Sequence, residues 1–128
     1  MPQAITALLQ DLANADGALV RRGRFLEVTF LLELGDSAYL IKIHRGRIEA
    51  IEPGPHVEPR YTFALRASAA AWARFWQAVP PPGAHDLMAM LKSGELRLQG
   101  DLQPFMANLR YFKELLALPR AAGAQQGR

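Results

Sequence analysis

The chain has 128 residues, contains no cysteine and carries a formal net charge of +3 from 15 basic and 12 acidic residues. This length suits one domain with a sizeable core, and the absence of cysteine excludes disulfides, thiolate zinc sites and a cysteine nucleophile. Arg21, Arg22 and Arg24 alone equal the excess charge. Nucleic-acid-binding domains usually concentrate much more positive charge on one face, so we expect no nucleic acid partner.

The first half of the chain predicts one helix followed by a meander of three strands. Apolar residues at helical spacing predict a short helix over 4–15, and the polar, arginine-bearing segment after it is expected to be a link. Alternating apolar and polar residues predict strands over 25–34 and 38–44, which we expect to pair as an antiparallel hairpin. The tight turn at Arg45-Gly46 leads into a third, shorter strand over 47–52.

Prolines separate this meander from the second half of the chain. The loop over 53–59 cannot support a regular strand ladder, and renewed alternation over 60–66 predicts a fourth strand. Ser68 is the expected N-cap of a helix over 69–79, which ends at a second proline cluster. A further helix is predicted over 85–93.

The stretch from 88 to 118 contains the best-defined junctions. Gly94 suits the left-handed position that ends a helix, and the alternation over 95–99 predicts a short fifth strand. Asp101 is expected to accept hydrogen bonds from the free N–H groups of the next helix, which has Pro104 in its first turn. The apolar stripe of this closing amphipathic helix consists of Leu102, Phe105, Met106, Leu109, Phe112 and Leu116.

These elements predict an α+β domain over 1–118, with a single five-stranded mixed, mainly antiparallel sheet covered by helices on one face. Because the last strand follows helices, we expect it to join the sheet parallel to a neighbour. The tail over 119–128 has no apolar pattern and is expected to be disordered. There is no apolar run of the roughly 18 residues that a membrane span needs, and no secretory signal is evident, so we expect a soluble, cytoplasmic protein.

The order of elements around Gly94 also resembles a known family. A helix is followed by the pattern Gly-x-Leu-x-Leu-x-Gly-Asp and a closing amphipathic helix, the pattern being carried by Gly94, Leu96, Leu98, Gly100 and Asp101. This arrangement resembles the end of the sterol carrier protein type-2 family of small lipid-binding domains. The resemblance implies an apolar tunnel between sheet and helices, binding or transfer of a lipid, and no metal. Glu95 departs from the pattern, because family members often have lysine there.

Few residues indicate enzyme chemistry, so we predict a protein that is not an enzyme and needs no cofactor. His44, His56 and His85 lie in three different segments and form no metal-binding pair on a helix. Asp86, or His85, is expected to cap a helix. The alternative is a small α+β enzyme in which His85 and Asp86 act as acid and base.

The large apolar residues have two interpretations. Stripes of this kind usually form an ordinary core, but methionines and aromatic residues also suit irregular apolar pockets. Given the resemblance, we predict that the pocket for a small apolar ligand is lined by Phe63, Trp72, Trp76, Met88, Met90, Phe105, Met106, Leu109 and Phe112. The expected ligand is a fatty acid, acyl-CoA or comparable lipid; a composition that leans bacterial argues against sterol.

The energetics permit such binding without catalysis. A dozen buried methylenes contribute about 10 kcal/mol before ordering costs are subtracted. The competing hypothesis is a non-catalytic interaction or dimerisation module, accessory to a partner enzyme. In that case Phe105, Met106 and Phe112 would pack on protein, either a second copy or a partner, instead of ligand.

Overall fold

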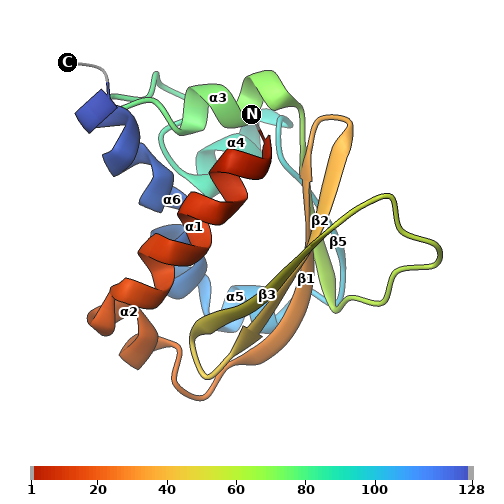
Figure 1. The fold of residues 1–128 in the computed structure, drawn as a ribbon. Coiled ribbons are helices and arrows are strands. Elements are labelled where there is room, and N and C mark those ends of the chain that lie inside the picture. Colours follow the sequence, from red (N-terminus) through yellow and green to blue (C-terminus); the bar gives the residue numbers. More distant parts are fainter. Residues whose placement is uncertain (1, 127–128) are drawn as a thin grey trace.

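A five-stranded mixed sheet with the strand order β3-β2-β1-β4-β5 organises the computed structural model, which describes residues 2–126 and the side chains of 5–120 (Figure 1). The strands are β1 (Glu27–Leu34), β2 (Ser37–His44), β3 (Arg47–Pro53), β4 (Phe63–Ala67) and β5 (Arg97–Gly100). The helices are α1 (Pro2–Ala15), α2 (Gly17–Arg22), α3 (Ala69–Phe75), α4 (Leu87–Ser93), α5 (Gln103–Ala107) and α6 (Leu109–Gln126).

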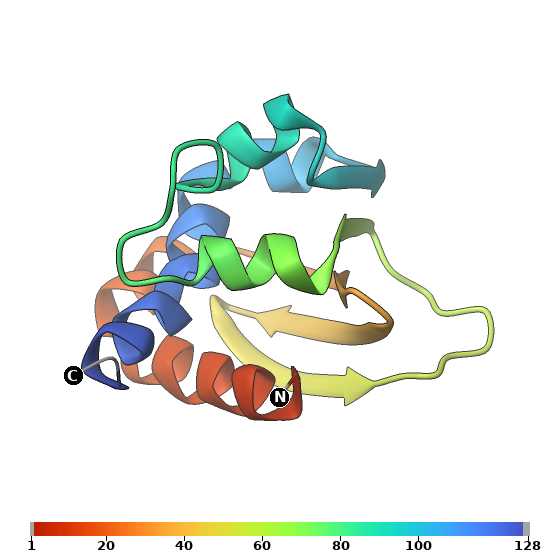
Figure 2. The same cartoon turned by 90° about the horizontal axis from the view of Figure 1, so that it is seen from above.

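The helices collect on one face of the sheet, while the loop between β3 and β4 projects from the other side (Figures 1 and 2). Strand alternation explains this arrangement, because Phe30, Leu32 and Leu34 of β1 all point into the core beneath the helices. The predicted α+β class with one covered sheet face is therefore confirmed. None of the helices in the described part of the chain is long and apolar enough to cross a membrane.

The predicted hairpin of β1 and β2 is confirmed, and β3 continues the meander antiparallel to β2. The predicted parallel placement of the last strand is wrong. Strand β5 runs antiparallel to β4, whereas β4 itself runs parallel to β1. After β4, the chain passes through α3 and α4 and re-enters the sheet at the end where β4 finished, so β5 runs in the opposite direction to β4. The parallel pairing of β4 with β1 results from the proline loop, which carries the chain from edge strand β3 to the far side of β1.

Two helical segments also differ from the sequence-based expectation. The predicted arginine-bearing link contains α2, because the Asp16 carboxylate accepts a hydrogen bond from Leu19 N–H and caps a short helix. The predicted single closing helix is divided into α5 and α6 at Asn108. The backbone leaves the helical conformation at Asn108, with a φ of −121° and a ψ of 33°, and the Asn108 side-chain N–H donates to the carbonyl of Pro104 at 2.9 Å.

Helix α6 continues through Pro119 to Gln126, where the sequence predicts a disordered tail over 119–128. The Arg120 guanidinium donates hydrogen bonds to the carbonyl of Phe75 at 2.7 and 3.0 Å and lies over the Phe75 ring. These contacts hold the helix against α3 just after the proline. Residues 127 and 128 lie outside the described part of the chain.

Candidate ligand site between the sheet and the helices

Side-chain caps fix the helices that lie near the predicted site. Ala71 N–H donates to Ser68 Oγ at the start of α3, and Ala89 N–H donates to Asp86 Oδ1 at the start of α4. Gly94 ends α4 with a φ of +85°. Gln103 N–H donates to Asp101 Oδ1 beside α5. The sequence-based expectations for all four junctions are thus confirmed.

Five aromatic rings fill the layer between the sheet and helices α5 and α6. We call them the phenylalanine cluster: Phe30, Phe63, Phe105, Tyr111 and Phe112. The Phe63 ring stacks on Phe30 with centroids 5.4 Å apart and meets Phe112 edge-on at 5.3 Å. The Phe105 ring lies 5.5 Å from both Phe63 and Phe112. All five side chains are at most 1% exposed, so the cluster forms a closed apolar contact in this structure.

Two tryptophans extend the apolar layer toward α3. Trp72 and Trp76 stack with ring centroids 5.3 Å apart. Their indole N–H groups donate to main-chain carbonyls, Trp72 to Glu33 of β1 and Trp76 to Leu116 of α6, each at 2.7 Å. Both donors are therefore satisfied while the rings remain apolar. The pair ties the sheet and α6 to the end of α3.

The nine predicted site residues divide into three groups by exposure. Phe63, Trp72, Met90, Phe105 and Phe112 belong to the core and are at most 1% exposed. Trp76, Met88 and Leu109 are half-buried. Met106 is 48% exposed, so its predicted place in the apolar stripe is wrong. That the nine line a ligand cavity remains a prediction.

The break at Asn108 explains the misplaced residue. A single helix would present Met106 and Leu109 on the same face as Phe112, but α6 instead buries Tyr111, Phe112, Leu115 and Leu116. Sequence reasoning missed Tyr111 for this reason. Phe30 was not predicted as a site residue either, although the alternation over 25–34 that predicted this strand also indicates that Phe30 faces the core.

The partner surface proposed for an interaction module is also corrected. Phe105 and Phe112 are completely buried in the chain's own core, so neither can pack on a second protein in this structure. Of the three residues predicted for that surface, Met106 remains exposed.

Several surface pockets lie outside the predicted site. One of about 500 Å³ lies on the face of the sheet without helices, beside Lys42, His44 and Tyr61. Another, of about 450 Å³, lies between α2 and α6, where Leu19, Ala117 and Leu118 contribute apolar surface. Neither of these two pockets is lined by any of the nine predicted residues.

The possible catalytic residues occupy structural positions. His44 pairs with Glu27 at 3.0 Å, and His56 hydrogen-bonds the carbonyl of Glu52 at 3.1 Å. Asp86 caps α4, as expected, and lies 3.8 Å from Lys113, while the His85 side chain is exposed. Within the described residues, no group of three or more His, Cys, Asp or Glu side chains is placed to hold a metal ion.

Glu95 marks the departure from the lysine of the family pattern. Its carboxylate pairs with the guanidinium of Arg74 on α3. The acidic residue thus joins the segment between α4 and β5 to α3, a role that a lysine could not fill beside Arg74.

The cap at Asp86 leads to a pH-dependent prediction. Burial raises the pKa of Asp86, but the Ala89 N–H, Lys113 and other neighbours outweigh it, and the pKa lies below its ordinary value of 3.8. A carboxylate with a lowered pKa stabilises the fold above its unfolded-state pKa and loses that contribution as the pH falls through the folded-state pKa. Asp86→Ala should therefore cost about 1 kcal/mol at neutral pH.

Urea unfolding of both proteins checks this prediction. The difference in free energy of unfolding between wild type and Asp86→Ala should shrink below about pH 4. A difference that stays constant down to about pH 3 would contradict a contribution from the ionised carboxylate.

No protein-family model matches the chain, and no curated protein sequence is significantly similar to it. Solved structures do match. A sterol carrier protein 2 superposes with a TM-score of 0.73 and 17% identity, over 91% of this chain and 94% of that one. The ubiquinone synthesis protein UbiJ-SCP2 gives 0.59 and 20%, over 93% and 90% of the two chains.

An enzyme contains a similar region. A stereoselective inverting sec-alkylsulfatase from a Pseudomonas species gives a TM-score of 0.61 and 16% identity over 92% of this chain but 16% of the enzyme. The similarity to the enzyme therefore concerns a small part of it. The full-length matches have the same mixed α+β architecture, and the chain has a sterol carrier protein 2-like fold.

Proposed function

We propose that this protein binds or carries an apolar ligand, such as a fatty acid, an acyl-CoA or a similar lipid, in the layer between the sheet and the helices. The observation that carries the proposal is the apolar layer itself, in which the phenylalanine cluster and the Trp72–Trp76 pair occupy the middle of a sterol carrier protein 2-like fold. We infer a non-catalytic role, which is supported by the positions of His44, His56 and Asp86 in an ion pair, a loop hydrogen bond and a helix cap.

A ligand would have to displace part of the phenylalanine cluster. Phe105 is the member best placed to move, because it lies on α5, a helix of only five residues (Gln103–Ala107) that is held at its start by one side-chain hydrogen bond, from Gln103 N–H to Asp101. The break at Asn108 separates α5 from α6, so α5 can shift without bending the long helix. Withdrawal of Phe105 would open space beside Phe63 and Phe112.

Tryptophan fluorescence tests the proposal, because both tryptophans of the chain belong to the proposed site. A panel of a fatty acid, an acyl-CoA and a short-chain ubiquinone is titrated, the last because one similar fold belongs to a ubiquinone synthesis protein. We expect saturable changes in emission for at least one compound. Native mass spectrometry should show the same compound bound at about one molecule per chain.

The proposal would be overturned if the protein purified without lipid and no compound of the panel gave either a saturable fluorescence change or a bound species. The apolar core would then serve packing alone. A matched soluble compound with the same head group and a two-carbon chain serves as the control, since it offers little apolar surface to bury.

A further inference from the structure

Five arginines gather at one end of the molecule, where the C-terminal end of α2 meets the turn between β2 and β3. We call this surface the arginine end: Arg21, Arg22, Arg24, Arg45 and Arg47, together with Phe25. Close backbone packing brings the two segments together, because a Cβ added to Gly46 would lie 2.4 Å from the carbonyl oxygen of Val20. The Tyr111 hydroxyl also donates to the Gly46 carbonyl at 2.7 Å.

Most of the arginines at the arginine end form no ion pair with a described carboxylate. Arg22 pairs with Glu114 at 3.0 Å. No carboxylate among residues 5–120 forms an ion pair with Arg21, Arg24, Arg45 or Arg47, and all four side chains are exposed. The Arg24 and Arg47 guanidiniums instead donate to the main-chain carbonyls of Arg21 and Asn14, at 2.8 and 3.2 Å.

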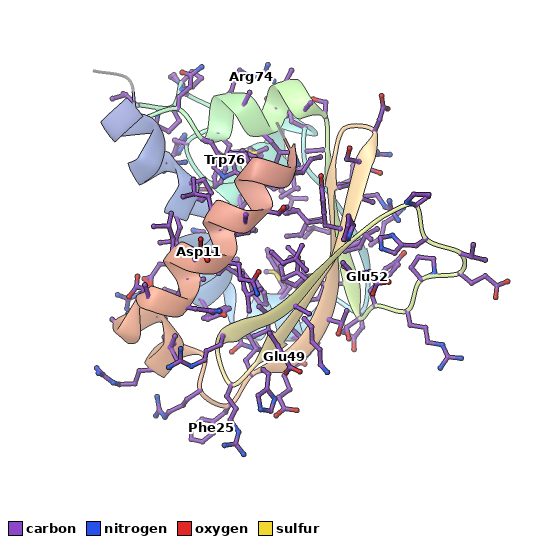
Figure 3. All side chains as sticks on the ribbon, in the orientation of Figure 1. Asp11, Phe25, Glu49, Glu52, Arg74 and Trp76 are labelled. Atoms are coloured by element: carbon purple, nitrogen blue, oxygen red, sulfur yellow. The ribbon has the colours of Figure 1, made fainter. Side chains whose placement is uncertain are left out.

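Phe25 projects from the middle of this charge. Its side chain is 88% exposed, and the Arg24 guanidinium lies 4.7 Å from the centre of its ring (Figure 3). The backbone beside it is held firmly, since Leu26 N–H donates to Gly23 at 2.8 Å and Arg45 N–H donates to Leu26 at 2.9 Å. The fold thus exposes an aromatic ring to solvent at a fixed backbone position, on the same surface as the arginine side chains.

We propose that the arginine end docks the protein on an anionic lipid bilayer, with Phe25 inserted at the interface and the arginines on lipid head groups. An anionic bilayer matches both features, because its surface attracts clustered cations and its interfacial region accepts aromatic rings. A nucleic acid would use the cations, but a single projecting ring provides no extended stacking platform for bases. Docking of this kind goes beyond the proposed ligand site and does not depend on it.

Co-sedimentation with phosphatidylcholine vesicles, with and without phosphatidylglycerol, tests this proposal. The wild-type protein should bind vesicles that contain phosphatidylglycerol, and it should dissociate from them as the salt concentration is raised. The double variant Arg21→Gln, Arg45→Gln should bind about 25-fold more weakly, and Phe25→Ser about tenfold more weakly.

Matched controls come from elsewhere on the surface. Arg60→Gln with Lys92→Gln removes the same charge, and Val57→Ser removes a side chain that is 94% exposed, on the loop between β3 and β4. Both control variants should bind as wild type does. Equal losses in test and control variants would overturn the proposal, as would undiminished binding by Phe25→Ser or a preference for a single-stranded oligonucleotide over the vesicles. Sedimentation measures the protein and not ligand uptake, so this result and that of the fluorescence titration are independent.

Discussion

Gly46→Ala is expected to lower the free energy of unfolding by about 3 kcal/mol or more. Gly46 has a φ of +82°, which costs an alanine about 1–2 kcal/mol. The added methyl group would also lie 2.4 Å from the carbonyl oxygen of Val20 and 2.9 Å from the carbonyl carbon of Gly23. Because these neighbours are backbone atoms, the β2–β3 turn would have to move away from α2.

Gly94→Ala is the matched control for this clash. Gly94 has a φ of +85°, but a Cβ there would meet no other atom within 4 Å. Gly94→Ala therefore isolates the backbone strain, and we expect it to lower the free energy of unfolding by about 1 kcal/mol. Urea unfolding followed by circular dichroism measures both variants. Similar losses in the two would show that the contact between the turn and α2 yields easily and does not fix the arginine end.

Local patterns were sufficient to predict most elements of this fold. The alternation that predicted the hairpin depends only on which side chains of a strand are buried. The caps at Ser68, Asp86 and Asp101 likewise act within three residues of their own positions. Strand direction is a different kind of property. Nothing local to 95–100 distinguishes a parallel from an antiparallel β5, because the direction depends on where α3 and α4 leave the chain relative to the sheet.

The site was predictable to the same extent and for the same reason. Phe63, Phe105 and Phe112 follow periodicities that survive in the structure, and all three meet in the phenylalanine cluster. Met106 follows the same spacing but is exposed, because the backbone leaves the helical conformation at Asn108, with a φ of −121° and a ψ of 33°, and so interrupts the helix on which the spacing depends. An asparagine in the middle of the predicted amphipathic helix was the signal for that break.

Phe105→Ala is expected to weaken the fold and strengthen ligand binding at the same time. Phe105 is completely buried, so its truncation should lower the free energy of unfolding by about 3–5 kcal/mol. If a ligand must displace this ring in the wild-type protein, the variant no longer bears that cost and should bind the same ligand about tenfold more tightly. Ligand should then raise the melting temperature of the variant more than that of wild type, at equal free ligand concentration.

Ile48→Ala is the control that separates a specific gain at position 105 from the binding of ligand in any cavity that a truncated core residue leaves. Ile48 is 1% exposed and lies on edge strand β3, three strands away from Phe63 of β4, and its carbonyl accepts hydrogen bonds from Gln10 and Asn14 of α1. Its truncation also leaves an apolar cavity, at a cost of about 2–5 kcal/mol. Equal gains in ligand affinity for both variants would contradict a specific role for Phe105. If Phe105→Ala does not fold, Phe105→Leu preserves more of the packing and should show the same two changes to a smaller degree. A gain confined to position 105 would identify α5 as the element that opens, because no other cluster member lies on a helix that can move without disturbing the sheet or α6.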